Sequence, residues 1–176
     1  TPFSAYGLFQ AHEYDKLKFG IAAYTPFGST VQWEDNWIGR FALTRLELKA
    51  IFIQPTLSYR IADVIGIGAG FVISTGNVTL QKDIPVQDSS GNFGHAELSG
   101  KAKGFGFNAG IHYDLNKKLS VGITYRSQIN MQLKNGNATF TVPGSLDSNF
   151  PDGAFTGSLP LPRVITLGWA YKPTAK

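Results

Sequence analysis

Few side chains in this sequence are suited to covalent or metal chemistry, and their spacing does not favour it. The three histidines, His12, His95 and His112, form no HxH or HExxH pattern of the kind that binds a metal ion. Cysteine is absent, which excludes disulfides and Cys-ligated zinc. Ser120 and Ser127 have no His or Asn partner at a spacing that indicates a lipase. We therefore expect no enzyme, no metal site and no cofactor.

A glycine-rich segment, Gly66-Ile-Gly-Ala-Gly70, has the composition of a phosphate-binding loop. Its glycines recur at every second residue, with apolar residues between them. Alternate residues of a strand share a face, so this spacing keeps one face of a strand small. We interpret the segment as a strand rather than as a phosphate site.

Three cations, Arg60, Arg126 and Lys134, fall on the polar faces of predicted strands. They can form internal salt bridges, with Asp114 or with carboxylates elsewhere, or they can contact a ligand carboxylate, and both readings stay open. His112 falls on a similar face near a tight turn, where we expect a hydrogen-bonded structural role. The net charge is only +4 and the basic residues are scattered singly, so no nucleic-acid partner is expected.

The elements that position these residues are strands, because the hydrophobic period is two along most of the chain. From Leu119 to Lys134, for example, the odd positions are mostly apolar and the even positions are polar or small. This pattern predicts one long strand with one apolar face. Similar alternation predicts seven strands, at about residues 3–13, 17–28, 46–61, 65–83, 96–115, 119–142 and 160–172. No helical period of comparable strength is present, so the fold class is all-β.

Short polar turns alternate with long loops. The turns are Tyr14-Asp15-Lys16, Ala62-Asp63-Val64 and Asn116-Lys117-Lys118, and the long loops cover roughly 29–45, 85–95 and 143–158. This order predicts antiparallel up-and-down strands with all long loops at one end. An aromatic residue lies close to each short turn, namely Tyr14, Tyr59 and Tyr113, and by extension Tyr171 lies at the end of the last strand. Together these features are typical of a transmembrane β-barrel of the bacterial outer membrane.

A soluble lipid-binding barrel of lipocalin type is the alternative. Its outward face meets water and carries Lys and Glu, whereas the polar face here is mainly Gly, Ser, Thr, Asn and Gln. Such residues suit a crowded lumen better. Charged residues make up 16% of the chain, against about 25% in soluble domains. We therefore expect the apolar face, including the odd positions of 119–133, to contact lipid.

Seven strands do not complete a barrel, because bacterial single-chain barrels have an even number. Open edges in lipid would also leave backbone groups unpaired. We expect residues 1–176 to form a single partial barrel domain of about seven strands. A hairpin signal, Asn135-Gly136, could divide the sixth strand. No signal peptide is visible from Thr1 onward, so we expect that one was removed or that the chain starts inside a longer protein.

Several segments, taken in order, resemble the FadL/TodX family of outer-membrane transporters for hydrophobic compounds. One is Gly104-Phe-Gly-Phe-Asn108-Ala-Gly-Ile-His-Tyr113-Asp-Leu-Asn116, running on to Ile123-Thr-Tyr125-Arg-Ser127. The others are Tyr24-Thr-Pro-Phe-Gly28 with Trp33 and Trp37-Ile-Gly-Arg40, the hairpin from Pro55 to Gly68, and Leu159-Pro-Leu-Pro162.

The resemblance implies a fourteen-stranded monomeric barrel with an N-terminal hatch. This chain would cover about its middle half, without the hatch and the remaining strands. The implied function is passive uptake of hydrophobic molecules, long-chain fatty acids or hydrocarbons, across the bacterial outer membrane. Ligand would be captured between long extracellular loops, bind in the lumen and leave sideways into the membrane at a kinked strand.

The resemblance also assigns residues to ligand binding. Trp33, Trp37, Ile38 and Phe41 belong to the capture loop, and Val78, Leu80, Lys82 and Arg126 to the lumen. The loop residues can equally form an aromatic girdle or pack within the loop. Fatty-acid members use basic lumenal residues for the head group, where this sequence has Leu80 with Lys82 two residues on. That departure leaves neutral hydrocarbons open.

The lateral opening is assigned to Tyr24, Thr25, Pro26, Phe27 and Gly28. Proline cannot donate to a strand ladder, so it favours edges, bulges and broken pairing. We expect Thr25-Pro26-Phe27-Gly28 not to pair fully with a neighbour. The alternative is that the strand ends at Thr25 and a loop begins. For the whole protein, a FadL-like adaptor that binds protein partners without transport remains a second functional hypothesis.

Overall fold

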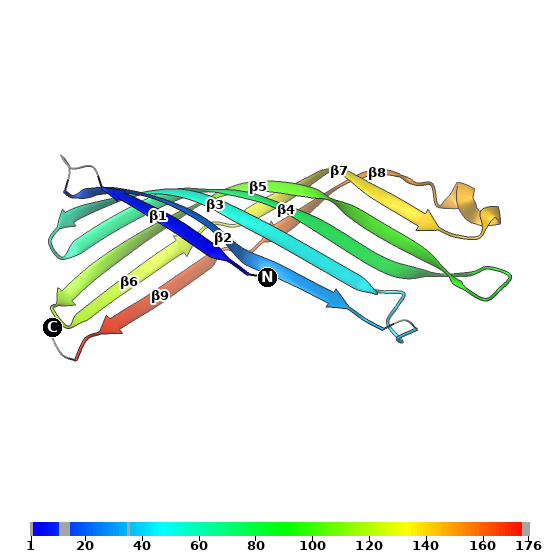
Figure 1. Cartoon of the computed structure of the whole chain (residues 1–176), viewed down its shortest axis with the longest axis horizontal. Helices are drawn as coiled ribbons and strands as arrows, with labels where there is room; N and C mark the ends of the chain where they lie inside the picture. The colour runs from blue at the N-terminus through cyan, green and yellow to red at the C-terminus, as the bar shows by residue number, and fades with distance from the viewer. Residues whose placement is uncertain (1, 11–14, 35, 174–176) are drawn as a thin grey trace.

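The computed structural model describes residues 2–10, 15–34 and 36–173, which form one open antiparallel sheet (Figure 1). Its strands are β1 (Ser4–Gln10), β2 (Leu17–Gln32), β3 (Arg45–Ala62), β4 (Ile65–Gln87), β5 (Phe93–Asn116), β6 (Leu119–Arg126), β7 (Ile129–Thr141), β8 (Gly153–Leu161) and β9 (Val164–Tyr171). A short 3-10 helix, η1 (Gly144–Asn149), precedes β8. Within the described ranges, no helix is long and apolar enough to cross a membrane. The all-β prediction is confirmed.

The pairing is up-and-down, with the nine strands lying in seven lines. Each of β1 to β4 pairs with the next strand, and β5 pairs with β6 along one half and with β7 along the other. β9 pairs with β6, and β8 with β7. Two predicted strands are therefore each interrupted for two residues, at Ser127-Gln128 and at Pro162-Arg163.

Short connections gather at one end of the sheet and long connections at the other, as predicted (Figure 1). We call these the short-turn end and the long-loop end. The long loops are shorter than predicted, because β2 runs on to Gln32 and only residues 88–92 separate β4 from β5. The predicted loop 143–158 is wrong in its last part, where β8 begins at Gly153. Tyr14 and His12 lie outside the described residues.

Asn135-Gly136 forms a bulge and not a hairpin. Asn135 has a positive φ of 60°, and β7 continues past it to Thr141. The register with β8 shifts by one residue between Leu133 and Gly136. The hairpin signal therefore reflects the left-handed backbone of Asn135, a conformation that one type of bulge also uses.

The largest departure from the sequence prediction lies in the line of β6 and β7. The odd positions of β6 lie on the exposed face, where Ile123 is 46% exposed, but Ile129, Met131 and Leu133 of β7 are buried. Between the pairs Asn108–Arg126 and Lys103–Gln132, four residues of β5 (104–107) stand opposite five of the other line (127–131). One extra residue exchanges the two faces of a strand. The prediction of lipid contact is therefore wrong for Ile129, Met131 and Leu133.

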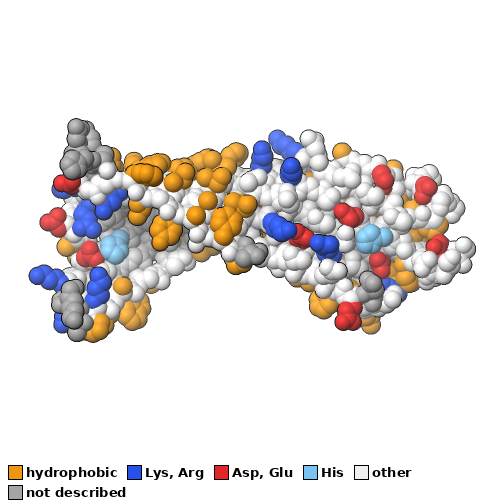
Figure 2. Space-filling model, viewed as in Figure 1, with side chains coloured by type: hydrophobic (Ala, Val, Ile, Leu, Met, Phe, Trp, Pro, Cys, Tyr) orange, Lys and Arg blue, Asp and Glu red, His pale blue; other side chains and the backbone are white. Residues whose placement is uncertain are grey.

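The outer face of the sheet carries an apolar band near the short-turn end. On this face the apolar positions run from Ile51 to Ile61 in β3, from Ile65 to Ile73 in β4 and from Phe105 to Tyr113 in β5. Each run covers 9–11 residues, the length with which a tilted strand crosses a bilayer. Figure 2 shows hydrophobic side chains gathered over this part of the molecule, with charged side chains on both sides of them.

Beyond the band, towards the long-loop end, the polarity of the two faces reverses. The outer positions of β3 become Arg45, Glu47 and Lys49, while its inner positions change from Gln54 and Thr56 to apolar residues. The inner apolar residues pack into a core of Ala50, Phe52, Val72, Ala102, Ile129, Met131, Leu133 and Leu161. This core joins residues from β3, β4, β5, β7 and β8, so it spans most of the width of the sheet. Side chains from strands this far apart meet on the concave face.

Candidate functional site

The inner apolar wall is the surface best suited to hold a hydrophobic molecule. It is defined here as the core residues just given together with Leu46, Leu48, Val78, Leu80 and Leu98, which occupy the inner positions of β3, β4 and β5. Val78 and Leu80, both predicted ligand residues, are half-buried. Lys82 lies on the same face, nearer the long-loop end, and pairs with Ala96. The wall thus brings three of the predicted lumenal residues onto one face.

Arg126 lies at the edge of this wall that is nearer the short-turn end. Its guanidinium carbon is 5.3 Å from the ring centre of Phe27 and 5.6 Å from that of Phe52. Cations favour aromatic faces at such distances. Phe52 is fully buried and also contacts Tyr24, with ring centres 5.6 Å apart. The structure therefore places a cation and three aromatic rings together on the inner face.

Phe52 was not singled out by the sequence argument, although the sequence carries a signal for it. Ala50-Ile-Phe-Ile53 is a run of four apolar residues inside an alternating strand. Such a run marks the level at which both faces are apolar, because the polarity reverses there. The inner positions of Leu46, Leu48 and Leu98 are explained by the same reversal of polarity.

Strand β2 bulges where Pro26 predicts an interruption. Tyr24 pairs with Phe52 and Phe27 pairs with Ala50, so Thr25 and Pro26 together stand opposite Ile51. On its other side β2 stays paired here, since the amide of Thr25 donates to the carbonyl of Phe3 at 3.1 Å, in register with β1. Phe27 and Gly28 pair with β3, so the interruption covers two of the four expected residues. The strand does not end at Thr25.

The loop from Trp33 to Thr44 packs mainly on itself and on β4 and β5. Trp33 and Trp37 stack with ring centres 4.4 Å apart, and Trp37 Nε1 donates to the carbonyl of Leu43 at 2.9 Å. Phe41 meets Phe93 edge-on at 5.0 Å. Ile38 is 98% exposed. Two of these predicted capture residues therefore stack on each other, one packs against Phe93 and one is exposed.

Arg40 fixes this loop to the sheet. Its guanidinium lies 4.4 Å from the ring centre of Phe93, and its backbone carbonyl accepts a hydrogen bond from the amide of Asp83 at 2.9 Å. Nε of Arg40 lies 3.9 Å from Asp83 Oδ2. His95 Nδ1 lies 3.3 Å from the other oxygen of the same carboxylate.

The inner face behind the apolar band, at the short-turn end of the sheet, is polar. A hollow of about 620 Å³ is lined there by residues that include Lys18, Ser58, Arg60, His112 and Thr124. His112 Nε2 lies 2.9 Å from Asp114 Oδ1, and Ser120 donates to the same oxygen at 2.6 Å. The expected hydrogen-bonded role of His112 is confirmed. Ser120 bonds the carboxylate and not the imidazole, which is not the geometry of a serine nucleophile.

The remaining candidates have structural places. Among the described residues, Arg60, Arg126 and Lys134 form no salt bridge with Asp114. Lys134 lies on the outer face, because the shift at Ser127-Gln128 turns it outward with Gln132. Its predicted lumenal position is therefore wrong. The glycines Gly66 to Gly70 lie in β4, where a Cβ added to Gly70 would meet Asn108 Oδ1 at 2.5 Å.

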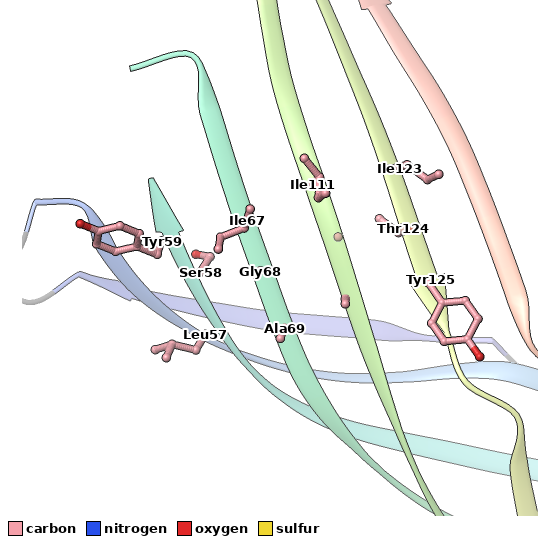
Figure 3. A pocket seen from close by; sticks show the side chains of 12 residues that line it. Leu57, Ser58, Tyr59, Ile67, Gly68, Ala69, Ile111, Ile123, Thr124 and Tyr125 are labelled. Atoms are coloured by element: carbon pink, nitrogen blue, oxygen red, sulfur yellow. The ribbon is translucent and has the colours of Figure 1, made fainter. Parts of the chain in front are cut away.

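A second hollow, of about 550 Å³, opens on the outer face of the band (Figure 3). Leu57 and Tyr59 line one side of it and Ile123 and Tyr125 the other, with the small residue Ala69 between them. It is separate from the inner wall.

The comparisons place the chain among known membrane proteins. The model of the family "Outer membrane protein transport protein (OMPP1/FadL/TodX)" matches residues 5–176. A long-chain fatty acid transport protein of Salmonella typhi is 24% identical over 170 residues, covering 87% of this chain and 39% of the relative. Outer membrane protein P1 of Haemophilus influenzae is 23% identical over 207 residues, covering 91% and 43%.

Solved structures show the same fold. A FadL homologue of Pseudomonas aeruginosa has a TM-score of 0.81 and 19% identity, and the match covers 97% of this chain and 45% of that one. The toluene transporter TbuX of Ralstonia pickettii has a TM-score of 0.71 and 13% identity, with coverage of 97% and 50%. The chain therefore spans less than half of the curated relatives and about half of the solved structures.

Proposed function

The chain belongs to the OMPP1/FadL/TodX family of outer membrane transport proteins, and on that premise we propose that the intact protein takes up hydrophobic molecules. The substrates would be long-chain fatty acids or hydrocarbons, which are named for relatives of this chain. No energy source is required, because burial of apolar surface stabilises each transfer by about 25 cal/mol per Å².

One observation carries the proposal, namely the reversal of polarity along the sheet. In a chain that only had to sit in a membrane, the apolar side chains would stay on the lipid-facing side. Here they move to the inner face beyond the band, from Leu46 to Phe52 in β3 and from Ile129 to Leu133 in β7. A continuous apolar wall on the concave side offers a hydrophobic molecule a path shielded from water.

The proposed path ends at the bulge of β2. Phe27 and Phe52 close the lower end of the inner wall, and Thr25 and Pro26 of the bulge lie beside them without partners in β3. The outer face at this level begins its apolar band at Ile51 and Ile53. A molecule that leaves the wall through the bulge would therefore enter lipid directly. Capture by Trp33, Trp37, Ile38 and Phe41 at the long-loop end would precede this step.

Arg126 is the group that would meet a polar end of the ligand. It is half-buried, and its inner position opposite Asn108 faces the lumen. A guanidinium can bind a carboxylate through two hydrogen bonds. Fatty acids would use this contact, while hydrocarbons would need only the wall.

Deletion of Pro26 from the intact protein tests the exit. Two residues of β2 stand opposite one of β3, so removing one residue restores a regular ladder and keeps Tyr24 and Phe27 on the inner face. We expect uptake of radiolabelled oleate or toluene by whole cells to fall at least tenfold, while the barrel still inserts.

Deletion of Asn135 is the matched control, because it removes a bulge with the same count of two residues opposite one from β7, away from the exit. Insertion of both variants is followed by their heat-modifiable migration in gels. Unchanged uptake after deletion of Pro26, or equal losses in both variants, would contradict the proposed exit.

A further inference from the structure

Three lysines on the outer face lie at the border where the apolar band ends. Lys103 is the next outer residue after Phe105 in β5, Lys101 follows it, and Lys49 is the next outer residue after Ile51 in β3. Lys49 and Lys101 each pair with Asn77 of β4. We call Lys49, Lys101 and Lys103 the border cluster.

The border cluster is compact enough to act on one ligand. Strands lie about 4.8 Å apart, so the Cα atoms of Lys49 and Lys101, two strands apart, are separated by about 10 Å. Lys101 and Lys103 are two residues apart on one face of one strand, or about 7 Å. Lysine side chains from these positions can converge on a single anionic group.

The charge of the cluster is only partly neutralised by the protein. Glu47 accepts hydrogen bonds from Lys49 and, at 2.7 Å, from Arg45. Glu97, the other outer carboxylate of this region, accepts instead from Gln81 Nε2 at 2.8 Å. Within the described part of the chain, Lys101 and Lys103 form no ion pair, and both are exposed. Two free ammonium groups therefore remain at the border.

The height of the cluster selects its ligand. The last outer apolar residues, Ile51, Ile73 and Phe105, lie in neighbouring strands and mark the edge of the hydrocarbon layer. Lys103 directly follows this edge, and Lys101 lies one pleat further out. The headgroup layer is about 5–7 Å thick on each side of a bilayer. Phosphates of lipid headgroups are the anions held at that level.

In Figure 2, Lys and Arg side chains gather beside the hydrophobic patch, towards the long-loop end. We propose that Lys101 and Lys103, with Lys49, bind phosphorylated lipid headgroups of the outer leaflet. This binding would fix the height of the barrel in the membrane. It requires only insertion of the protein and is independent of what the protein transports.

The test uses the intact protein in phosphatidylcholine nanodiscs that contain a minor fraction of a fluorescent lipid with a phosphomonoester headgroup. Binding is measured as energy transfer from the tryptophans, with the dephosphorylated lipid as reference. We expect enrichment of the phosphorylated lipid around the wild type. A lysine near an anionic surface changes affinity by about fivefold, so K101Q/K103Q should lose enrichment about twenty-fivefold.

The matched control is K117Q/K118Q, which removes two exposed lysines at the short-turn end of the band. It should keep the enrichment. Loss in the control equal to that in K101Q/K103Q, or enrichment retained in K101Q/K103Q, would overturn the proposal. Complete displacement of the lipid by millimolar inorganic phosphate would also overturn it, because the cluster would then be a site for the free ion. Heat-modifiable migration confirms that each variant is folded.

Discussion

An arginine placed on the outer face should destabilise the barrel according to its depth in the apolar band. Leu57 is 52% exposed and lies six residues along β3 from Ile51, the edge of the band. At about 3.4 Å per residue and a tilt of about 45°, this places Leu57 about 14 Å below the edge. The band of an outer-membrane barrel is about 25 Å tall, so Leu57 lies near its middle.

The expected cost of Leu57→Arg is therefore about 2–4 kcal/mol, the range for arginine at the bilayer midplane. Ile51→Arg should cost only about 0–1 kcal/mol, the range near the interface. Unfolding of the intact protein in lipid vesicles by guanidinium, followed by tryptophan fluorescence, measures both. Ser58→Arg, on the polar inner face beside Leu57, is the control and should cost less than Leu57→Arg. Equal costs at Leu57 and Ile51 would refute the assignment of the band.

Three other predictions test separate parts of the structure. Met131→Arg should prevent folding because Met131 is fully buried, while Gln132→Arg on the outer face should be tolerated; the reverse result in a heat-modifiability assay would restore the original assignment of faces. Replacing Trp37 and Phe41 together with Ser should weaken uptake at limiting ligand concentration without changing the unfolding free energy, and unchanged uptake would leave these residues a packing role only. Hydrogen bonds from the Asn92 and Ser90 backbone amides and the Asn92 side chain lower the pKa of Asp88. Because the folded pKa of Asp88 lies below its ordinary value of 3.8, the loop 88–92 should keep its structure above that pH. It should lose that structure as the pH falls through the folded pKa. An NMR titration in which Asp88 and the Asn92 amide do not change together would contradict this prediction.

The strands and their order could be predicted from the sequence because alternation is a local property. A period of two fixes a strand and its two faces, and the alternation of short and long connections fixes the up-and-down order. Lys134 shows the limit of such a prediction. Its face depends on how many residues of the neighbouring strand stand opposite it, and the extra residue at Ser127-Gln128 is visible only in the pairing.

The candidate site could be predicted only in part for a related reason. Pro26 carries a local signal, the missing backbone donor, and the bulge is where that signal places it. The contacts of Arg126 with Phe27 and Phe52 join residues from three strands far apart in sequence, so no local pattern reveals them. The division of the loop into a Trp33–Trp37 stack and a Phe41–Phe93 pair is likewise a matter of tertiary packing.

The polarity reversal is produced in two different ways along the sheet. In β3, β4 and β5 the pleat continues unbroken, and the change lies in the residues themselves, as when Lys49 and Ile51 share the outer face with the inner Ala50 between them. In the other two lines the apolar residues stay mostly at odd positions, from Leu119 to Leu133 in β6 and β7 and from Phe155 to Tyr171 in β8 and β9. There the interruption of each line exchanges the faces instead. Both routes bring apolar side chains to the concave side at the same level. A single bulge could be an accident of packing, but composition and register changing together at one height indicate that this height is a boundary between two solvents. On the short-turn side of this boundary the outer face meets lipid. On the long-loop side the inner face is the one that excludes water.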